Sequence, residues 1–275
     1  MTKNSLLDLD SHFAFGDNWC AFADLITEEH ISTAVASMER LLPRGQLAGR
    51  KMLDIGCGSG LSMLSALRLG AAHVEGVDID PSSVRAAESV LSKFNPDGPW
   101  QVDECSVFDL PNKRSSEYDI VHSWGVLHHT GAMWQAIDAA CTMVAPKGLL
   151  CIALYRKTPL CSLWRAEKWI YTNAPEWFQW LVRGVFKGAF VCGLLVTGRS
   201  PRNYFSGYKI ARGMNWHHDI HDWLGGYPYE SVTPEELSKF LGERGFSMER
   251  RFEKRAAAFG LFGSHCDEFV ARKMK

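Results

Sequence analysis

The chain has 275 residues, and its 30 lysine and arginine residues nearly balance 31 aspartate and glutamate residues. This length is sufficient for one large core or two small ones, and we expect one domain that carries an insertion. The balanced charge lacks the basic excess on which nucleic-acid binding depends, so no nucleic-acid partner is expected.

Two features bear on the compartment. The segment that ends at Trp19 contains acidic residues and no apolar run followed by a small-residue cleavage site, which argues against a secretory signal. The eight cysteines show neither paired CxxC spacing nor the density of a disulfide scaffold, so most should be reduced, buried apolar residues. We therefore expect a cytoplasmic protein.

Residues 1–50 are expected to form an N-terminal helical lid, because the apolar positions of residues 27–42 follow a helical period. Residues 51–155 alternate short apolar runs with helical segments, as in βαβ units around a parallel sheet. Strands are expected at 51–55, 73–79, 100–105, 118–123 and 148–155, with helices at 61–69, 81–94 and 133–144. These residues are predicted to form the cofactor-binding Rossmann-like core.

Residues 156–230 break this rhythm and are predicted to form a helical, acceptor-binding insertion after the fifth strand. Trp169, Trp177 and Trp180 have helical spacing there and predict the packing face of an amphipathic lid. The longest apolar stretch, 185–197, is interrupted by Lys187 and two glycines and is shorter than the ~20 residues that span a bilayer. We expect no transmembrane helix, while peripheral contact with a membrane stays open.

Residues 231–275 are expected to complete the core sheet with one helix and two strands. Thr233 is the expected N-cap of that helix, Pro234 its first residue and Gly245 its end. The fold class that follows is α/β, with a doubly wound, mostly parallel seven-stranded sheet.

A glycine-rich loop, Gly56-Cys57-Gly58-Ser59-Gly60, lies between the first predicted strand and its helix, where open α/β sheets bind ligands. About twenty residues on, Asp78 ends the second strand, and its carboxylate can accept hydrogen bonds from both hydroxyls of a ribose. An ordinary strand-to-helix turn would explain the glycines but not Asp78. The two features together predict an adenosine-type ligand, and Leu61 breaks the GxGxxG pattern of dinucleotide sites.

The segment LDIGCGSG, residues 53–60, resembles motif I of class I S-adenosylmethionine methyltransferases. Segments 105–111, 118–131 and 145–155 resemble later motifs of that family in the same order, and the resemblance continues to about residue 246. It implies a Rossmann-like methyltransferase fold and S-adenosyl-L-methionine as cofactor, with S-adenosyl-L-homocysteine as product.

The resemblance also implies which residues contact the cofactor. Asp54 would hold its methionine end, although a carboxylate that braces the loop is a nearly equal alternative. The family often has an acidic residue at the position of Ser106, so adenine contact is expected to shift to the Val107 backbone and Asp109. The expected cofactor-binding residues are Trp19, Asp54, Gly56, Cys57, Gly58, Ser59, Gly60, Asp78, Ile79, Ser106, Val107, Phe108 and Ser123.

Methyl transfer needs an aligned nucleophile, a dry pocket and often a base. His129, expected to begin a helix beyond the fourth strand, is the first candidate base, with a packing role as an even alternative. His218 and Asp222 are a second catalytic candidate, because they would share a helical face. The insertion cluster to which they belong could instead bind a metal, which we rank lower, or brace the lid.

The acceptor is expected to contact Trp124, Tyr155, Trp216 and Tyr227, although aromatic residues are more often core. The predicted function is methylation of O, N or C of a small, aromatic or apolar metabolite in biosynthesis. One alternative is a methyltransferase that acts on a prenylated quinone or lipid intermediate, and another is a non-catalytic S-adenosylmethionine-binding protein. An NAD-dependent oxidoreductase is disfavoured by Leu61 and by the absence of a Tyr-x-x-x-Lys pair. Oligomeric state, including a homodimer, is left open.

Overall fold

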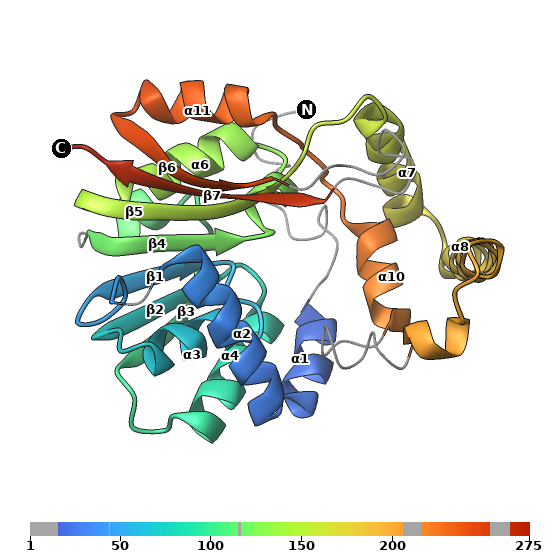
Figure 1. Ribbon diagram of the computed structural model, residues 1–275, viewed down its shortest axis with the longest axis horizontal. Coiled ribbons are helices and arrows are strands. Elements are labelled where there is room, and N and C mark those ends of the chain that lie inside the picture. The colour runs from blue at the N-terminus through green and yellow to red at the C-terminus, as the bar shows by residue number, and fades with distance from the viewer. Residues whose placement is uncertain (1–15, 44, 115–116, 206–215, 254–264) are drawn as a thin grey trace.

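A computed structural model describes residues 16–43, 45–114, 117–205, 216–253 and 265–275 (Figure 1). The helices are α1 (Gly16–Leu25), α2 (Glu28–Leu41), α3 (Leu61–Arg68), α4 (Pro81–Phe94), α5 (Leu110–Lys113), α6 (Met133–Thr142), α7 (Cys161–Asn173), α8 (Glu176–Val196), α10 (Trp216–Gly225) and α11 (Pro234–Gly242). The strands are β1 (Lys51–Ile55), β2 (His73–Asp78), β3 (Trp100–Glu104), β4 (Tyr118–Trp124), β5 (Val144–Tyr155), β6 (Phe246–Phe252) and β7 (Cys266–Lys273).

The strands form one seven-stranded sheet in the order β3-β2-β1-β4-β5-β7-β6. β1 pairs in parallel with both β2 and β4, whereas β7 is antiparallel to β5 and to β6. The chain therefore winds outward in one direction from β1 and in the other from β4. This confirms the predicted doubly wound, mostly parallel sheet, and it places the topological switch point between β1 and β4.

Helices cover both faces of the sheet. On one face, α2, α3 and α4 pack on apolar side chains such as Met52, Leu64 and Leu91, and on the other face α6 and α11 pack on a second cluster that includes Leu150 and Ile137. Strands that are buried on both faces need near-continuous apolar runs, which is why segments such as GLLCIALY read as central strands.

Capping residues set the start of two helices. Asp80 precedes α4 and accepts a hydrogen bond from the Ser82 backbone N–H at 2.7 Å, with Pro81 at the first helical position. Thr233 precedes α11 and forms a capping box with Glu236. Both helices thus begin where side-chain chemistry favours them.

The structure corrects three expectations. Trp169, Trp177 and Trp180, predicted to form a packing face, are each more than half exposed. His129 ends a short 3₁₀ helix, Leu127–His129, instead of beginning a helix, because Gly131 intervenes with a positive φ and α6 starts only at Met133. The apolar stretch expected to be too short lies in α8, which has 21 residues because its helix starts well before Val185. Within the described residues, α8 is long and apolar enough to cross a membrane, a weak indication on length and composition alone.

The insertion forms a separate helical layer. Tyr171 of α7 and Ile220 and Leu224 of α10 are buried together, and Val182 and Phe186 of α8 pack against them. Figure 1 shows α7 and α10 between the core and α8, which lies at the end of the molecule far from the sheet. The insertion is therefore anchored through α7 and α10.

Candidate functional site

The glycine-rich loop connects β1 to α3 at the carboxyl end of β1. The backbone N–H groups of Gly56 and Cys57 donate to the Val77 carbonyl at 2.7 and 3.1 Å, which ties the loop to β2. Gly58 has φ +53°, a conformation that side chains disfavour, and an added Cβ would lie 3.0 Å from the Trp19 ring. The loop therefore needs glycine here for both its turn and its close contact.

Asp78 ends β2 beside this loop. Its Oδ2 accepts the Gly58 N–H and its Oδ1 accepts the Asp80 N–H, each at 3.0 Å. Burial raises the pKa of this carboxyl to about 6 although both hydrogen bonds lower it. Each carboxylate oxygen has about two acceptor sites, so both oxygens retain capacity for a further donor such as a hydroxyl.

Helix α1 brings Trp19 to the loop. The Gly16 N–H donates to Asp80 Oδ2 at 2.9 Å, and Cys20 Sγ donates to the Ser82 carbonyl at 3.3 Å. These contacts hold α1 on the start of α4, and the Trp19 ring then lies against Gly58. The structure thus brings together Trp19, the glycine loop and Asp78 from three separate segments, as predicted.

Asp54 makes a contact that the sequence reading missed. His122 of β4 donates from Nδ1 to Asp54 Oδ1 at 2.7 Å, and both side chains are buried. Asp54 and His122 are register partners on the paired strands β1 and β4, so their side chains point to the same face. One Asp54 oxygen therefore stabilises the switch point by joining β1 to β4. The sequence could have indicated this contact, because His122 is a polar residue at an inward-facing position of an apolar strand.

The remaining predicted cofactor residues divide into backbone and packing roles. Ser106 Oγ accepts the Phe108 N–H at 3.3 Å, and the Val107 side chain is buried in the core, so both residues stabilise the turn after β3. Ser123 is fully buried and donates to the Ile55 carbonyl at 2.9 Å. Ile79 follows Asp78 and is half-buried, while Ser59 in the loop is buried.

A second group of side chains gathers at the carboxyl ends of β4 and β5. His129 and Tyr155 lie edge to face with ring centroids 5.3 Å apart, and Tyr155 lies 5.1 Å from Tyr229. The Tyr229 segment reaches this place because the Glu230 N–H donates to the His128 carbonyl and the Val232 N–H donates to the Tyr155 carbonyl, each at 3.0 Å. The sequence predicted Tyr155 and His129 here but not Tyr229.

The two adjacent histidines differ in environment. His128 is fully buried, and burial together with His129 lowers its pKa well below the ordinary value, so it is neutral. His129 donates from Nδ1 to the Pro228 carbonyl at 2.8 Å. Because Nδ1 carries this proton, the neutral His129 ring has its acceptor nitrogen at Nε2, the form that a general base requires.

Trp124 ends β4 with about half of its side chain exposed. Its Nε1 donates to Glu268 Oε1 at 3.0 Å, and the other Glu268 oxygen pairs with Arg40 of α2. Glu268 is nearly fully buried on β7, so this carboxylate joins helix α2 to the far half of the sheet. The sequence reading identified Trp124 but neither of its charged neighbours.

Part of the predicted acceptor site is only partly described. Trp216, His218 and Asp222 lie in helix α10, which confirms a helical segment and places His218 and Asp222 one turn apart, but their side chains are outside the described structure. Tyr227 precedes Pro228 and is half-buried. Among the described side chains no group of three metal-ligating residues occurs.

His221 of the same helix has a structural partner set. Its Nδ1 lies 2.7 Å from the Tyr171 hydroxyl and 2.9 Å from Arg183 Nη1. These contacts join α10, α7 and α8. His221 is therefore part of the packing of the insertion.

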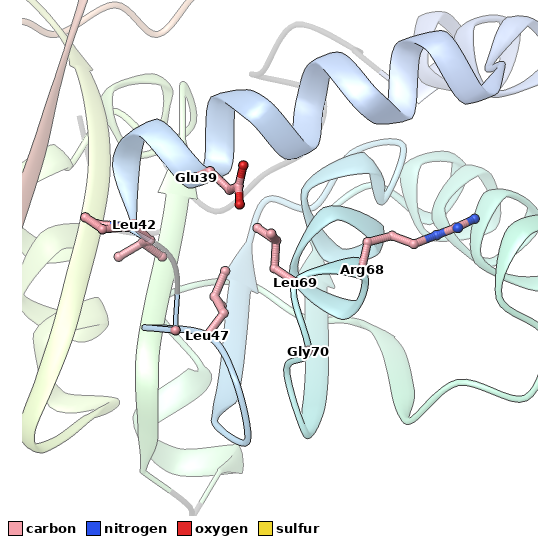
Figure 2. A pocket seen from close by; sticks show the side chains of 8 residues that line it. Glu39, Leu42, Leu47, Arg68, Leu69 and Gly70 are labelled. Atoms are coloured by element: carbon pink, nitrogen blue, oxygen red, sulfur yellow. The ribbon is translucent and has the colours of Figure 1, made fainter.

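A pocket of about 370 Å³ lies at the opposite end of the strands from this chemistry. Figure 2 shows Leu42 and Leu47 from the segment before β1 facing Leu69 and Gly70 before β2. These residues mark the amino ends of the strands. The ligand crevice of an open α/β sheet lies at the carboxyl ends, so we assign no function to this pocket.

The fold and the site define a doubly wound α/β protein with a nucleoside-type ligand site. An adenosine cofactor fits the residues present, because a side-chain-free turn at Gly58 faces a carboxylate and an indole ring. The profile of the "Methyltransferase domain" family matches residues 28–249, and the chain belongs to this family.

Individual relatives agree with this assignment. The chain is 31% identical to the ubiquinone biosynthesis O-methyltransferase of Xanthomonas euvesicatoria, over 44% of this chain and 50% of that protein. It is 37% identical to the ribosomal protein L11 methyltransferase of Xanthomonas axonopodis, over 54% of this chain and 44% of that protein. The chain thus matches at most about half the length of these relatives.

Solved structures share the fold. Magnesium protoporphyrin IX methyltransferase from Synechocystis, solved with bound S-adenosylhomocysteine, has a TM-score of 0.52 at 19% identity, covering 90% of this chain and 84% of that chain. An S-adenosylmethionine-dependent methyltransferase from Mesorhizobium loti has a TM-score of 0.50 at 15% identity, covering 86% and 96%. The Rossmann-like methyltransferase fold is confirmed.

Proposed function

We propose that this chain transfers the methyl group of S-adenosyl-L-methionine to an O, N or C atom of a small aromatic or apolar acceptor. The observation that carries the proposal is the meeting of two groups at adjacent strand ends. The glycine loop and Asp78 follow β1 and β2, and the cluster of His129, Tyr155 and Tyr229 follows β4 and β5. Because β1 and β4 are neighbours, both groups border the switch point.

The chain's own residues would divide the work as follows. When bound, the cofactor supplies an electrophilic methyl group on a sulfonium. Asp78 would hold the ribose hydroxyls, and the loop backbone would approach the rest of the cofactor closely. Tyr155 would contact a planar acceptor, with the buried Tyr229 ring packed against it, and His129 Nε2 would accept the proton that a hydroxyl or amine acceptor loses. Trp19 and the insertion would exclude water.

A methyl-transfer assay over a panel of small phenolic, amine and enolic acceptors tests this proposal, with S-adenosylhomocysteine as the measured product. With an acceptor found, His129→Gln should lower kcat about 100-fold or more, because general-base catalysis contributes about that much. His73→Gln, at the amino end of β2, is the matched control and should leave kcat unchanged. Unchanged turnover in His129→Gln would remove this residue from the chemistry.

A second candidate acceptor is a prenylated quinone or lipid intermediate. The observation that favours it is the exposed apolar surface of α8 in the insertion. Including a short-chain prenylated quinone in the same panel decides between the two acceptor classes.

Two alternative functions without methyl transfer can be distinguished by experiment. A protein that binds S-adenosylmethionine but forms no S-adenosylhomocysteine with any acceptor would be a sensor or scaffold. Binding of a nicotinamide dinucleotide in a direct titration would instead favour an oxidoreductase. The cytoplasm is the proposed location, in keeping with eight cysteines whose spacing lacks the density of a disulfide scaffold.

A further inference from the structure

The outer face of α8 is a long uncharged apolar surface. Trp177 and Trp180 are about 70% exposed, Val185 is 66% exposed and Val196 is 88% exposed. Every exposed position of α8 after Glu176 is apolar or small, namely Trp177, Trp180, Leu181, Gly184, Val185, Gly188, Ala189, Cys192, Gly193, Leu195 and Val196. A soluble monomer rarely exposes a contiguous surface of this kind without a binding role.

The opposite face of α8 is committed to the protein. Val182 and Phe186 pack against the buried cluster of α7 and α10, and the Phe186 and Trp223 ring centroids are 5.1 Å apart. Arg183 Nη1 lies 2.9 Å from His221 Nδ1 and 3.3 Å from the Tyr171 hydroxyl. The helix is therefore fixed with its apolar side outward, and Arg183, near its middle, is turned inward.

The end of α7 adds to the apolar surface beside the α7–α8 connection. Trp169 is 51% exposed and Ile170 is 50% exposed. Trp169 and Ile170 lie in the last turns of α7, a few residues before Trp177. Large aromatic residues thus gather near the N-terminal end of α8.

Charge around α8 is strongly biased. Residues 176–205 contain four basic residues, Arg183, Lys187, Arg199 and Arg202, and one acidic residue, Glu176, in a chain with a net charge of −1. Arg199 and Arg202 follow the helix and are exposed. An apolar face with tryptophans, followed by two exposed cations, has the chemistry of a helix that lies in the interface of an anionic lipid bilayer.

We propose that the outer face of α8 docks the protein on an anionic lipid bilayer, with the helix axis in the plane of the membrane surface. The helix would not span the bilayer, because Arg183 and the inner apolar face are held by α7 and α10. Docking does not depend on the proposed function. Because α8 lies far from the sheet, docking would place the insertion between the membrane and the core. Arg165 of α7 donates to the Tyr229 carbonyl at 3.1 Å and so connects the insertion to the cluster at the ends of β4 and β5.

Co-sedimentation of the purified full-length chain with vesicles tests this proposal. Vesicles of phosphatidylcholine mixed with phosphatidylglycerol should bind the protein, and vesicles of phosphatidylcholine alone should bind it much more weakly. The double variant Arg199→Gln and Arg202→Gln should bind about 30-fold more weakly, because each cation near an anionic surface contributes about 1 kcal/mol. The matched control, Arg85→Gln and Lys93→Gln on exposed positions of α4, should bind like the wild type.

A second variant tests the apolar contribution. Trp177→Gln with Trp180→Gln should lower vesicle affinity about 100-fold through the loss of buried apolar area. Circular dichroism and S-adenosylmethionine titration of each variant report whether the core is intact. Loss of vesicle binding and loss of cofactor binding are therefore measured separately, so failure of the docking proposal can be distinguished from failure of the cofactor assignment.

Two outcomes would overturn the proposal. The first is that the wild-type protein does not bind anionic vesicles, or that the Arg199/Arg202 and Trp177/Trp180 double variants bind them as tightly as the wild type does. The second is a dimer in vesicle-free buffer that Trp177→Gln with Trp180→Gln dissociates, without vesicle binding. That result would assign the face to a second copy of the chain.

Discussion

The Asp78 carboxyl is held by two backbone N–H groups, and yet burial raises its pKa from 3.8 to about 6. Since the pKa is higher in the folded protein, the folded state binds more protons between these two values. The contribution of Asp78 to the stability of the unligated fold is therefore lost as the pH rises from about 4 to about 6. The site keeps a group that costs stability near neutral pH, which is common where a ligand is to be bound.

Cofactor binding should show the opposite pH dependence. The ionised carboxylate is the better acceptor for ribose hydroxyls, so affinity for S-adenosylmethionine should fall below about pH 6, approaching 10-fold per pH unit. Titration calorimetry over this range measures it. In Asp78→Asn the affinity for S-adenosylmethionine should be low and should not vary over this pH range, because the carboxyl is gone. A wild-type affinity that stays constant down to pH 5 would contradict the proposal that Asp78 binds the ribose.

At the residue scale, the sequence predicted groups that lie close along the chain. The glycine loop and Asp78 were predictable because a strand, a turn and a second strand fix their spacing. His122, Glu268 and Tyr229 were not, because their partners Asp54, Trp124 and Tyr155 lie in distant segments. Only the pairing of strands determines which of these polar side chains meet.

At the scale of single elements, α11 illustrates a boundary that the sequence determines. Thr233 Oγ1 accepts the Glu236 N–H at 3.1 Å, and Glu236 Oε2 accepts the Thr233 N–H at 3.0 Å. Both contacts involve residues three apart, so the predicted cap needed no tertiary information. The start of α8 was missed because Pro175 precedes a helix whose first half contains aromatic and charged residues in no simple apolar run.

Thr233→Ala should lower the free energy of unfolding by about 1 kcal/mol, because the Glu236 N–H at the start of α11 loses its hydroxyl acceptor. Thr33→Ala is a suitable control, since the Thr33 hydroxyl donates to the Glu29 carbonyl within α2 and caps nothing. Urea unfolding of both variants measures the difference. Equal stabilities would show that α11 does not depend on this cap.

At the scale of the whole molecule, alternating strands and helices predicted the doubly wound sheet, because each strand needs apolar cover on both faces. The placement of the insertion was not predictable in the same way. It depends on contacts such as the one between Lys168 of α7 and the Trp223 carbonyl of α10, which join segments far apart in the chain. The outer face of α8 is exposed because α7 and α10 pack against its inner face, which the sequence of α8 alone does not reveal.

Isothermal titration of the purified protein with S-adenosylmethionine and S-adenosylhomocysteine tests the central claim most directly. The wild type should bind both, and Asp78→Ala should lose affinity about 100-fold or more, because two hydrogen bonds to a charged group disappear. Asp97→Ala, on the exposed loop after α4, should bind like the wild type. If neither ligand binds the wild-type protein, or if Asp78→Ala binds as tightly as Asp97→Ala, the cofactor site proposed at this switch point is wrong.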